Sequence, residues 1–268
     1  MGGAGIELSN EDAYQTADGA YIYVFKYDAN NDNGQGQTEY DLSFDGDNVA
    51  DVLIVGGGGA GGYSIGGGGG GGGVIHATDV PLNSGSYTLK VGNGGLGTDI
   101  RSAARSGKHS EAFEAIAKGG GGGGGSGTWS GSIVDQAGSV GGSGGGASSR
   151  DGTSTGMNGS AAGTNTIGTI LVNGIVNNYN GHAGGFGPGR IETGSAKPVS
   201  SGGGGGAGAP GGDGEVNVSV ASFTSHPYDN SSMGGDGVMI NITGDDYWWA
   251  GGGGGGAFGV IGVNRGNG

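Results

Sequence analysis

The feature that most constrains this chain is an unbroken run of eight glycines, Gly66–Gly73. A glycine run has no side chains to bury, and ordering its backbone costs roughly 1–2 kcal/mol per residue. Only its N–H and C=O groups can offset that cost, and these groups must be paired once they leave water. An ordered fold for this sequence therefore has to hydrogen-bond glycine backbone to neighbouring backbone.

Glycine runs recur along the whole chain. Glycine accounts for 77 of the 268 residues, far above the usual share of about 7%. The runs are not spaced at every third residue, which excludes a collagen triple helix. The other runs are Gly56–Gly59, Gly119–Gly125, Gly144–Gly146, Gly202–Gly206 and Gly251–Gly256.

Segments with strand character alternate with these runs. β-Branched and aromatic residues predict strands over 20–28 and 38–44, which we expect to pair with each other. Helical periodicity is absent except at 109–118, where the glycines that follow favour a strand with Phe113 and Ile116 packing inward. Further strands are predicted within 51–55, 86–91, 169–176, 215–223 and 237–243.

A polyproline-II helix has three residues per turn and no internal hydrogen bonds, so its backbone groups point outward in several directions. Glycine helices of this kind can bond each other laterally, and eight residues give a rod of about 25 Å. The predicted fold is therefore all-β, with β-sandwich-like strands joined to a bundle of polyglycine/polyproline-II helices and almost no α-helix. We expect Gly66–Gly73 to be a rod surrounded by others, and the interrupted run 202–212 to be peripheral.

Two enzyme motifs overlap the first glycine run. Gly56, Gly58 and Gly61 have the spacing of a dinucleotide-binding loop, and Ser64 lies in a G-x-S-x-G pattern. Both motifs need a helix directly after them, whereas glycine costs a helix about 1 kcal/mol per residue. We therefore expect no enzyme and no cofactor, and keep a dinucleotide-dependent oxidoreductase as a remote alternative.

Charge and composition exclude other classes. The net charge is −14 with ten Lys+Arg and no basic cluster, which disfavours nucleic-acid binding. No apolar run approaches the about 20 residues of a membrane span, so no membrane insertion is expected. The chain has no cysteine, hence neither a disulfide nor a thiolate metal site. Its first residues, MGGAGIELSNEDAY, lack the pattern of a secretory signal peptide.

The loop 28–39 is the one segment with a metal-binding pattern. Asp28, Asn30, Asp32 and Glu39 fall at positions 1, 3, 5 and 12 of a calcium loop. Asn33 stands where that loop requires glycine, and a strand precedes it, so a polar hairpin loop is favoured and calcium binding is left open. The histidines show no metal spacing, and no metal site is predicted at His76, His109, His182 or His226.

Aromatic residues are the candidate contacts for a ligand. In DDYWWAG, strand alternation places Tyr247 and Trp249 on one face and Trp248 on the other. The pair forms either a platform for sugars or a hydrophobic cap, and the cap is favoured. The polar connections 96–109 and 126–143 are candidate display loops. The candidate receptor-contact residues are Trp129, Tyr179, Phe186 and Trp248.

The order of these segments resembles the glycine-rich domain of bacteriophage tail-fibre, adhesin and virion-surface proteins. The resemblance is carried by 52–59, by 73–95 with Pro81, Tyr87 and Thr88, and by the blocks KHSEAFEAIAKGGGGGG and YWWAGGGGGGAFG. It covers residues 49–268, and residues 1–48 carry no such resemblance. Animal receptor and antifreeze glycine bundles use cysteines or regular repeats, which this chain lacks.

The resemblance implies a non-enzymatic virion-surface protein, a fibre, adhesin or capsid decoration, whose rigid scaffold displays loops for host recognition. The implied partners are other virion proteins and a host cell-surface receptor, a glycan or outer-membrane component, with homo-oligomerisation left open. The implied location is the virion surface or extracellular space, without a secretory signal peptide in this chain. Residues 1–48 form a predicted N-terminal strand segment and 49–268 the glycine-rich domain. The alternative is an extracellular-matrix or cell-surface structural protein.

Overall fold

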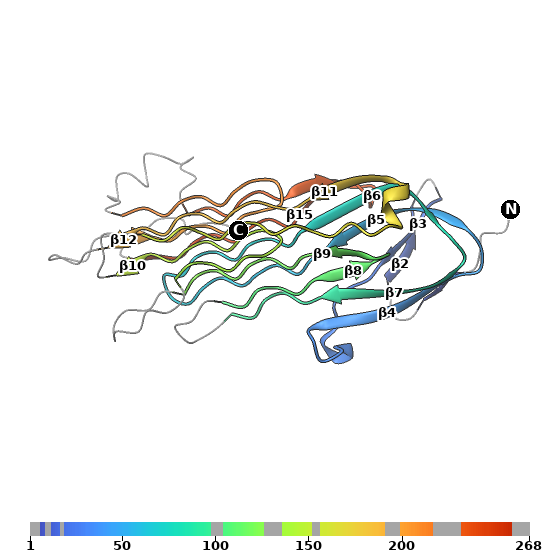
Figure 1. Cartoon of the computed structure of the whole chain (residues 1–268), viewed down its shortest axis with the longest axis horizontal. Coiled ribbons are helices and arrows are strands. Elements are labelled where there is room, and N and C mark those ends of the chain that lie inside the picture. Colours follow the sequence, from blue (N-terminus) through green and yellow to red (C-terminus); the bar gives the residue numbers. More distant parts are fainter. Residues whose placement is uncertain are drawn as a thin grey trace.

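The computed structural model describes residues 6–8, 12–16, 19–97, 104–125, 136–151, 156–190, 199–216 and 232–258. In this part of the chain β-sheets form one end of an elongated molecule, and wavy glycine-rich segments run from them to the other end (Figure 1). Helical structure in the described residues is limited to two 3-10 turns, η1 (Ala29–Asn31) and η2 (Leu171–Asn173). The predicted all-β class is confirmed.

The first layer is an antiparallel five-stranded sheet in the order β1-β4-β7-β8-β9. β4 and β7 pair along their full length, because β4 alternates apolar and polar residues and buries one face. Tyr40, Leu42 and Phe44 lie on that buried face. The strands are β1 (Ile6–Leu8), β4 (Gln37–Phe44), β7 (Gly85–Gly92), β8 (Ser110–Ala112) and β9 (Ala115–Ala117).

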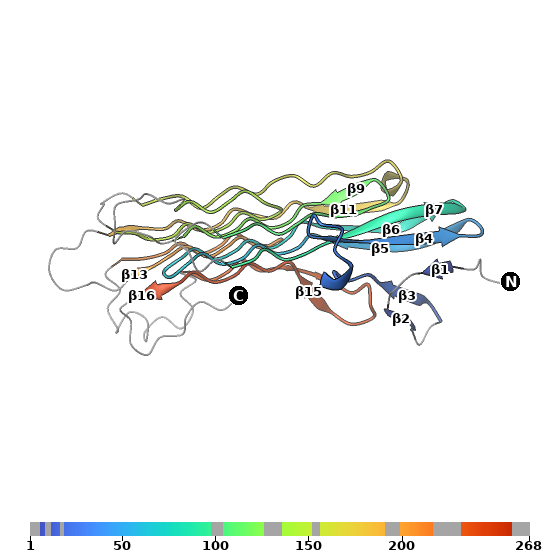
Figure 2. The same cartoon turned by 90° about the horizontal axis from the view of Figure 1, so that it is seen from below.

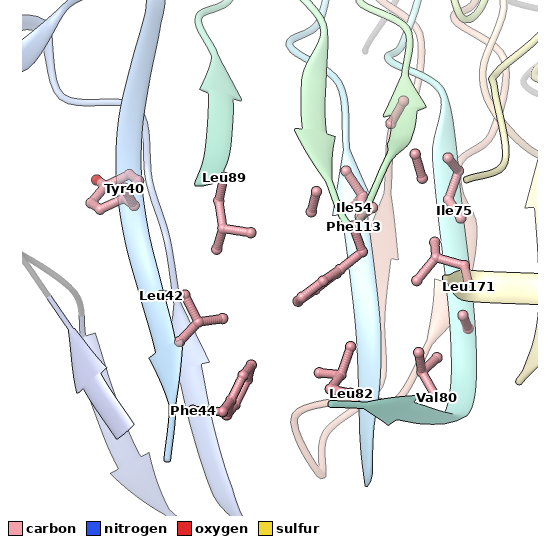
Figure 3. Packing of buried hydrophobic residues seen from close by; sticks show 14 residues of the cluster. Tyr40, Leu42, Phe44, Ile54, Ile75, Val80, Leu82, Leu89, Phe113 and Leu171 are labelled. Atoms are coloured by element: carbon pink, nitrogen blue, oxygen red, sulfur yellow. The ribbon is translucent and has the colours of Figure 1, made fainter. Parts of the chain in front are cut away.

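The second layer is a three-stranded antiparallel sheet, β11-β6-β5, built from β5 (Asn48–Val55), β6 (Val74–Leu82) and β11 (Ile175–Tyr179). A hydrophobic core fills the space between the two sheets (Figure 3). Tyr87 contacts Phe44 and Phe113 edge-on in this core, with ring centroids 5.7 and 5.3 Å apart. This packing confirms the sandwich-like arrangement of the strands.

The third layer is the hairpin of β14 (Val238–Ile240) and β15 (Tyr247–Trp249), which covers the outer face of the three-stranded sheet. A second, smaller cluster lies there, because successive residues of β5 and β6 point to opposite faces. Its buried members are Val74, Ala207 and Ile240, with Leu53, Val55, Tyr179, Val238, Ile242, Trp249 and Ala250 packed against them.

Two strand predictions are wrong in detail. The segment 20–28 forms β3 (Tyr21–Val24), which pairs with β2 (Asp12–Gln15) and not with 38–44. β4 pairs instead with β1 and β7, whose alternation matches its own buried face. Part of the strand expected over 169–176 is the 3-10 turn η2.

The preference for strand over helix at 109–118 is confirmed. The segment forms the hairpin β8–β9, with a tight turn at Phe113 and Glu114, where φ is 50° and 65°. Phe113 is buried in the core between the sheets. Ile116 lies at intermediate burial on β9.

Short strands mark the opposite end of the molecule. β10 (Arg150–Asp151) pairs in parallel with β12 (Gly189–Arg190), and β13 (Val199–Ser200) pairs antiparallel with β16 (Ala257–Phe258). Figures 1 and 2 show these four strands far from the sheet end. We call this the far end of the bundle.

Candidate functional site

The described glycine runs are extended rods that bond to each other through their backbones. In the run 66–73, which we call the central rod, hydrogen bonds to one neighbour recur at every third residue. The N–H groups of Gly67, Gly70 and Gly73 donate to the carbonyls of Gly124, Gly121 and Lys118, at 2.9, 2.8 and 2.7 Å. A period of three residues is that of the polyproline-II helix, so the predicted polyglycine-II geometry is observed.

Other residues of the central rod bond to other neighbours. Gly68 and Gly71 donate to Gly202 and Gly205, each at 2.9 Å. The carbonyls of the rod accept N–H groups from three further segments. The neighbours are 56–62, 118–124, 143–146, 202–205 and 253–256.

The central rod has no space for side chains. An added Cβ at each of its eight positions meets a neighbouring atom at 1.9–2.3 Å, a distance that real Cβ contacts do not reach. All eight residues are buried, which confirms the prediction of a surrounded rod. The run 202–212 was expected to be peripheral, and this is wrong for 202–206. These five glycines are buried too, since they lie beside the central rod; only the stretch from Gly208 onward reaches the surface.

The two enzyme motifs do not have the structure that their chemistry requires. Gly56, Gly58 and Gly61 lie in the extended rod that follows β5, and Ser64 lies in an exposed turn with φ of 59°. The central rod follows that turn, where both motifs need a helix. The prediction that no helix begins here is confirmed.

The carboxylates of the loop 28–39 accept hydrogen bonds from their own loop and from the adjacent Tyr27. Asp28 accepts the N–H of Asn30 at 2.9 Å, and Asp32 accepts the N–H of Gly34 at 2.6 Å and the hydroxyl of Tyr27 at 2.9 Å. Glu39 accepts the side-chain amide of Asn33 at 3.0 Å. These contacts are those of a polar turn, as favoured from the sequence. No group of three or more His, Cys, Asp or Glu side chains suited to a metal occurs in the described ranges.

Hydrogen bonding sets the ionisation of this loop. Desolvation opposes the charged form of Asp32, but hydrogen bonds from Tyr27, Gly34 and Gly36 and the charge of Lys108 outweigh it and lower its pKa. The same hydrogen bond to Asp32 is the main cause that raises the pKa of Tyr27. Asp32 is therefore held as a carboxylate that organises the loop.

A buried asparagine joins the sheets to the rods, and sequence reasoning missed it. Asn165 is 5% exposed. Its Oδ1 accepts the N–H of Lys118 at 2.9 Å, and its Nδ2 donates to Oδ1 of Asn178 at 3.0 Å and to the carbonyl of Tyr179 at 3.1 Å. Nothing in the local pattern GTNT separates this asparagine from a loop residue.

Four described strands that flank undescribed segments, β10, β12, β13 and β16, lie at the far end of the bundle. Rods leave the sheets, reach the far end and return, as the strands labelled there show (Figures 1 and 2). The residues that flank the undescribed segments lie at the ends of these rods, while 104–107 and 139–142 are themselves bonded within rods. The bounds predicted for the display loops, 96–109 and 126–143, are therefore too wide, because they include residues that belong to rods. The connecting segments are 98–103, 126–135, 152–155, 191–198 and 217–231.

The candidate aromatic contacts are not brought together. Trp248 is 68% exposed and lies opposite Met239 on the outer face of the β14–β15 hairpin. Tyr179 packs against the second cluster at the sheet end. Phe186 lies in a rod, where its N–H donates to Asp213 at 2.7 Å. Trp129 lies outside the described residues.

One face of β15, the aromatic strand before the last glycine run, covers the second hydrophobic cluster. Tyr247 and Trp249 share a face, with ring centroids 6.3 Å apart, and Trp249 packs on the second cluster. Trp249 Nε1 donates to the carbonyl of Ile240 at 3.3 Å. The predicted alternation is confirmed: Trp248 is on the face opposite to Trp249, and Tyr247, at the edge of the cap, is half-exposed.

The described helices include none long and apolar enough to cross a membrane. The model of a family described as a glycine-rich domain matches residues 33–268. The chain belongs to this family. No curated protein and no solved structure gives a significant match. The matched region contains both main sheets except β1, together with all the described rods.

Proposed function

We propose that this glycine-rich chain is a non-enzymatic bacteriophage virion-surface protein, a tail fibre, adhesin or capsid decoration. Its bundle is the scaffold, and the segments at the far end recognise the host cell. The single observation that carries this proposal is the shared position, at the far end of the bundle, of the described strands β10, β12, β13 and β16, each of which flanks an undescribed segment.

Steric exclusion supports two separate roles: the rods form the scaffold, and the connecting segments carry the residues for recognition. A Cβ is excluded throughout the central rod, so recognition chemistry cannot be placed there. The connecting segments carry the side chains that the rods lack: 126–135 reads SGTWSGSIVD, and 217–231 reads NVSVASFTSHPYDNS. Binding residues commonly lie on loops positioned by a rigid scaffold, which supports the assignment of recognition to these segments.

The proposed partners are a host cell-surface receptor, a glycan or outer-membrane component, and other virion proteins. The proposed location is the virion surface or the extracellular space. Trp248 is the described candidate contact, because an exposed aromatic face suits both sugars and apolar surfaces. The net charge of −14 favours recognition through such neutral faces over binding to phosphate groups.

The test replaces 126–135 with a Gly-Ser linker of equal length and measures binding of the purified protein to bacterial cells. We expect at least a tenfold loss of binding with a melting temperature within about 2 °C of the parent. The matched control carries Asp45→Ser and Gln35→Ser, two exposed positions at the sheet end, and retains binding. Unchanged binding after replacement of both 126–135 and 217–231 would contradict the proposal and favour a matrix or cell-surface structural protein.

An absorbance spectrum of the same purified protein tests the enzymatic alternative. The proposal predicts no flavin or nicotinamide band, because neither motif near Gly56 precedes a helix. A cofactor that copurifies in stoichiometric amount would contradict it.

A further inference from the structure

The central rod presents six lateral directions, because each of its three residue classes has one N–H and one C=O. Five directions are filled by described rods. Hydrogen bonds also join these rods to each other in sequence: Gly121 donates to Ser143, Gly205 to Gly144, and Gly204 to Gly253. The ring of neighbours runs in the order 56–62, 118–124, 143–146, 202–205 and 253–256. Between 253–256 and 56–62 the described chain shows no such bond.

One class of N–H groups in the central rod has no backbone acceptor among the described residues. These are the N–H groups of Gly66, Gly69 and Gly72. The carbonyls of Gly66 and Gly69 are used, since they accept from Gly256 and Gly253 at 2.8 Å. The described residues therefore lack backbone acceptors for this row of N–H donors, which recur at every third residue of the central rod.

The other two classes show where these donors point. The N–H of Gly70 donates to the rod 118–124. A Cβ added to Gly70 would point at Ser143, which belongs to the next rod in the ring. The N–H of Gly68 donates to the rod 202–205, and a Cβ added to Gly68 would point at Gly253, again in the next rod of the ring. For Gly69 the Cβ direction meets Gly59. Its N–H therefore points at the position before 56–62, which is the gap in the ring.

The walls of this gap are glycines that the described structure does not require. An added Cβ at Gly58 or Gly61 meets its nearest neighbour only at 4.0 or 3.9 Å. At Gly253, on the opposite wall, the nearest atom to an added Cβ is the N of Gly69, 3.4 Å away. Glycine at these three positions is explained if a further backbone packs against them, as it does elsewhere in the bundle.

We propose that the C-terminal segment 259–268, GVIGVNRGNG, is the sixth neighbour of the central rod. The described chain ends at Phe258, at the far end and directly after the rod 251–256 that forms one wall. A return toward the sheets then follows the gap. The turn 63–65 shows that three residues connect two rods here, and the remaining seven span about 22 Å, close to the length of the central rod. The segment has four glycines and no proline.

The test compares hydrogen exchange of individual glycine amides in the full chain and in a chain that ends at Phe258. We expect the amides of Gly69 and Gly72 to exchange about tenfold faster after truncation, because each loses a lateral hydrogen bond. Gly70, whose N–H is bonded to Gly121, is the internal reference and stays protected. A synthetic peptide of sequence GVIGVNRGNG restores the protection of Gly69 in the truncated chain.

A second pair of variants tests the gap in the full chain. Gly58→Leu with Gly61→Leu fills the gap and is expected to accelerate exchange at Gly69 without a change at Gly70. Gly97→Leu is the matched control, because an added Cβ at Gly97 meets nothing within 4 Å and Gly97 lies outside the gap.

Equal exchange of Gly69 and Gly72 in the full and truncated chains would overturn the proposal. A dimer in the full chain that becomes a monomer on truncation would also overturn it, because the segment would then lie in the gap of a second copy.

Discussion

The backbone N–H of Gly70 donates to the carbonyl of Gly121 at 2.8 Å, and the carbonyl of Gly70 accepts the N–H of Gly59 at the same distance. One residue without a side chain thus joins three rods. Cohesion in the bundle comes from lateral backbone hydrogen bonds, which need close approach. Glycine is required there because a Cβ at Gly70 meets Ser143 backbone at 2.3 Å.

Replacement of Asn165 by leucine removes the side chain that joins the sheets to the rods. The N–H of Lys118 and the carbonyl of Tyr179 lose their partner, and each unpaired buried group costs about 1–3 kcal/mol. We expect a loss of about 2–5 kcal/mol in the free energy of unfolding, measured by denaturant titration. The control Asn177→Ala, an exposed asparagine on the same strand as Asn178, is expected to change it by less than about 0.5 kcal/mol. Equal effects of the two variants would contradict this role.

We predict that the two tryptophans of β15 have different roles: Trp249 contributes to stability and Trp248 to binding. Trp249 packs on the second cluster, so Trp249→Ala is expected to cost about 2–4 kcal/mol of stability. Trp248 is 68% exposed, so Trp248→Ala is expected to leave stability within about 0.5 kcal/mol. Under the proposed function, Trp248→Ala lowers cell binding. Thermal melting and a cell-binding assay check both variants, and a larger stability loss for Trp248→Ala would contradict the assignment.

The faces of β15 were predictable from the sequence. Side chains alternate along any strand with a period of two, which places Tyr247 and Trp249 on one face and Trp248 on the other. This alternation did not predict strand partners: 21–24 and 38–44 both have strand composition, yet β3 pairs with β2 and β4 with β7. Partner choice depends on which buried faces meet in three dimensions. The period of two alone does not encode that.

The position of the central rod was predictable since eight glycines leave no face for a side chain. The order of its neighbours was not, because glycine carries no side chain to distinguish one rod from another. Asn165 was missed for a different reason: its partners, such as Lys118 and Tyr179, lie far away in sequence.

Stability is predicted to fall when the pH drops below about 6.5 through the titration of His76. Desolvation lowers the pKa of His76 from its ordinary value of 6.5, and the charge of Asp51 opposes this only in part. The unfolded chain therefore binds a proton at a higher pH than the folded chain. The stability is fully present above pH 6.5 and decreases as the pH falls from there toward the lowered folded pKa.

The measurement is denaturant titration from about pH 7.5 to about pH 5 for the parent and for His76→Gln. We expect a smaller decrease in the variant, whose side chain does not titrate. A decrease of the same size in both proteins would assign the pH dependence to other groups.

The central claim is that buried glycine rods hold the bundle together, and a valine scan of Gly66–Gly73 tests it most directly. We predict that valine lowers the melting temperature at all eight positions, by roughly 5–15 °C each. Valine forces neighbouring backbones apart and leaves groups unpaired at about 1–3 kcal/mol apiece. Gly97→Val, at an exposed position with no atom within 4 Å of its Cβ, is predicted to change the melting temperature by less than about 2 °C. Tolerance of valine at every third position of Gly66–Gly73, or at all of them, would contradict the surrounded rod.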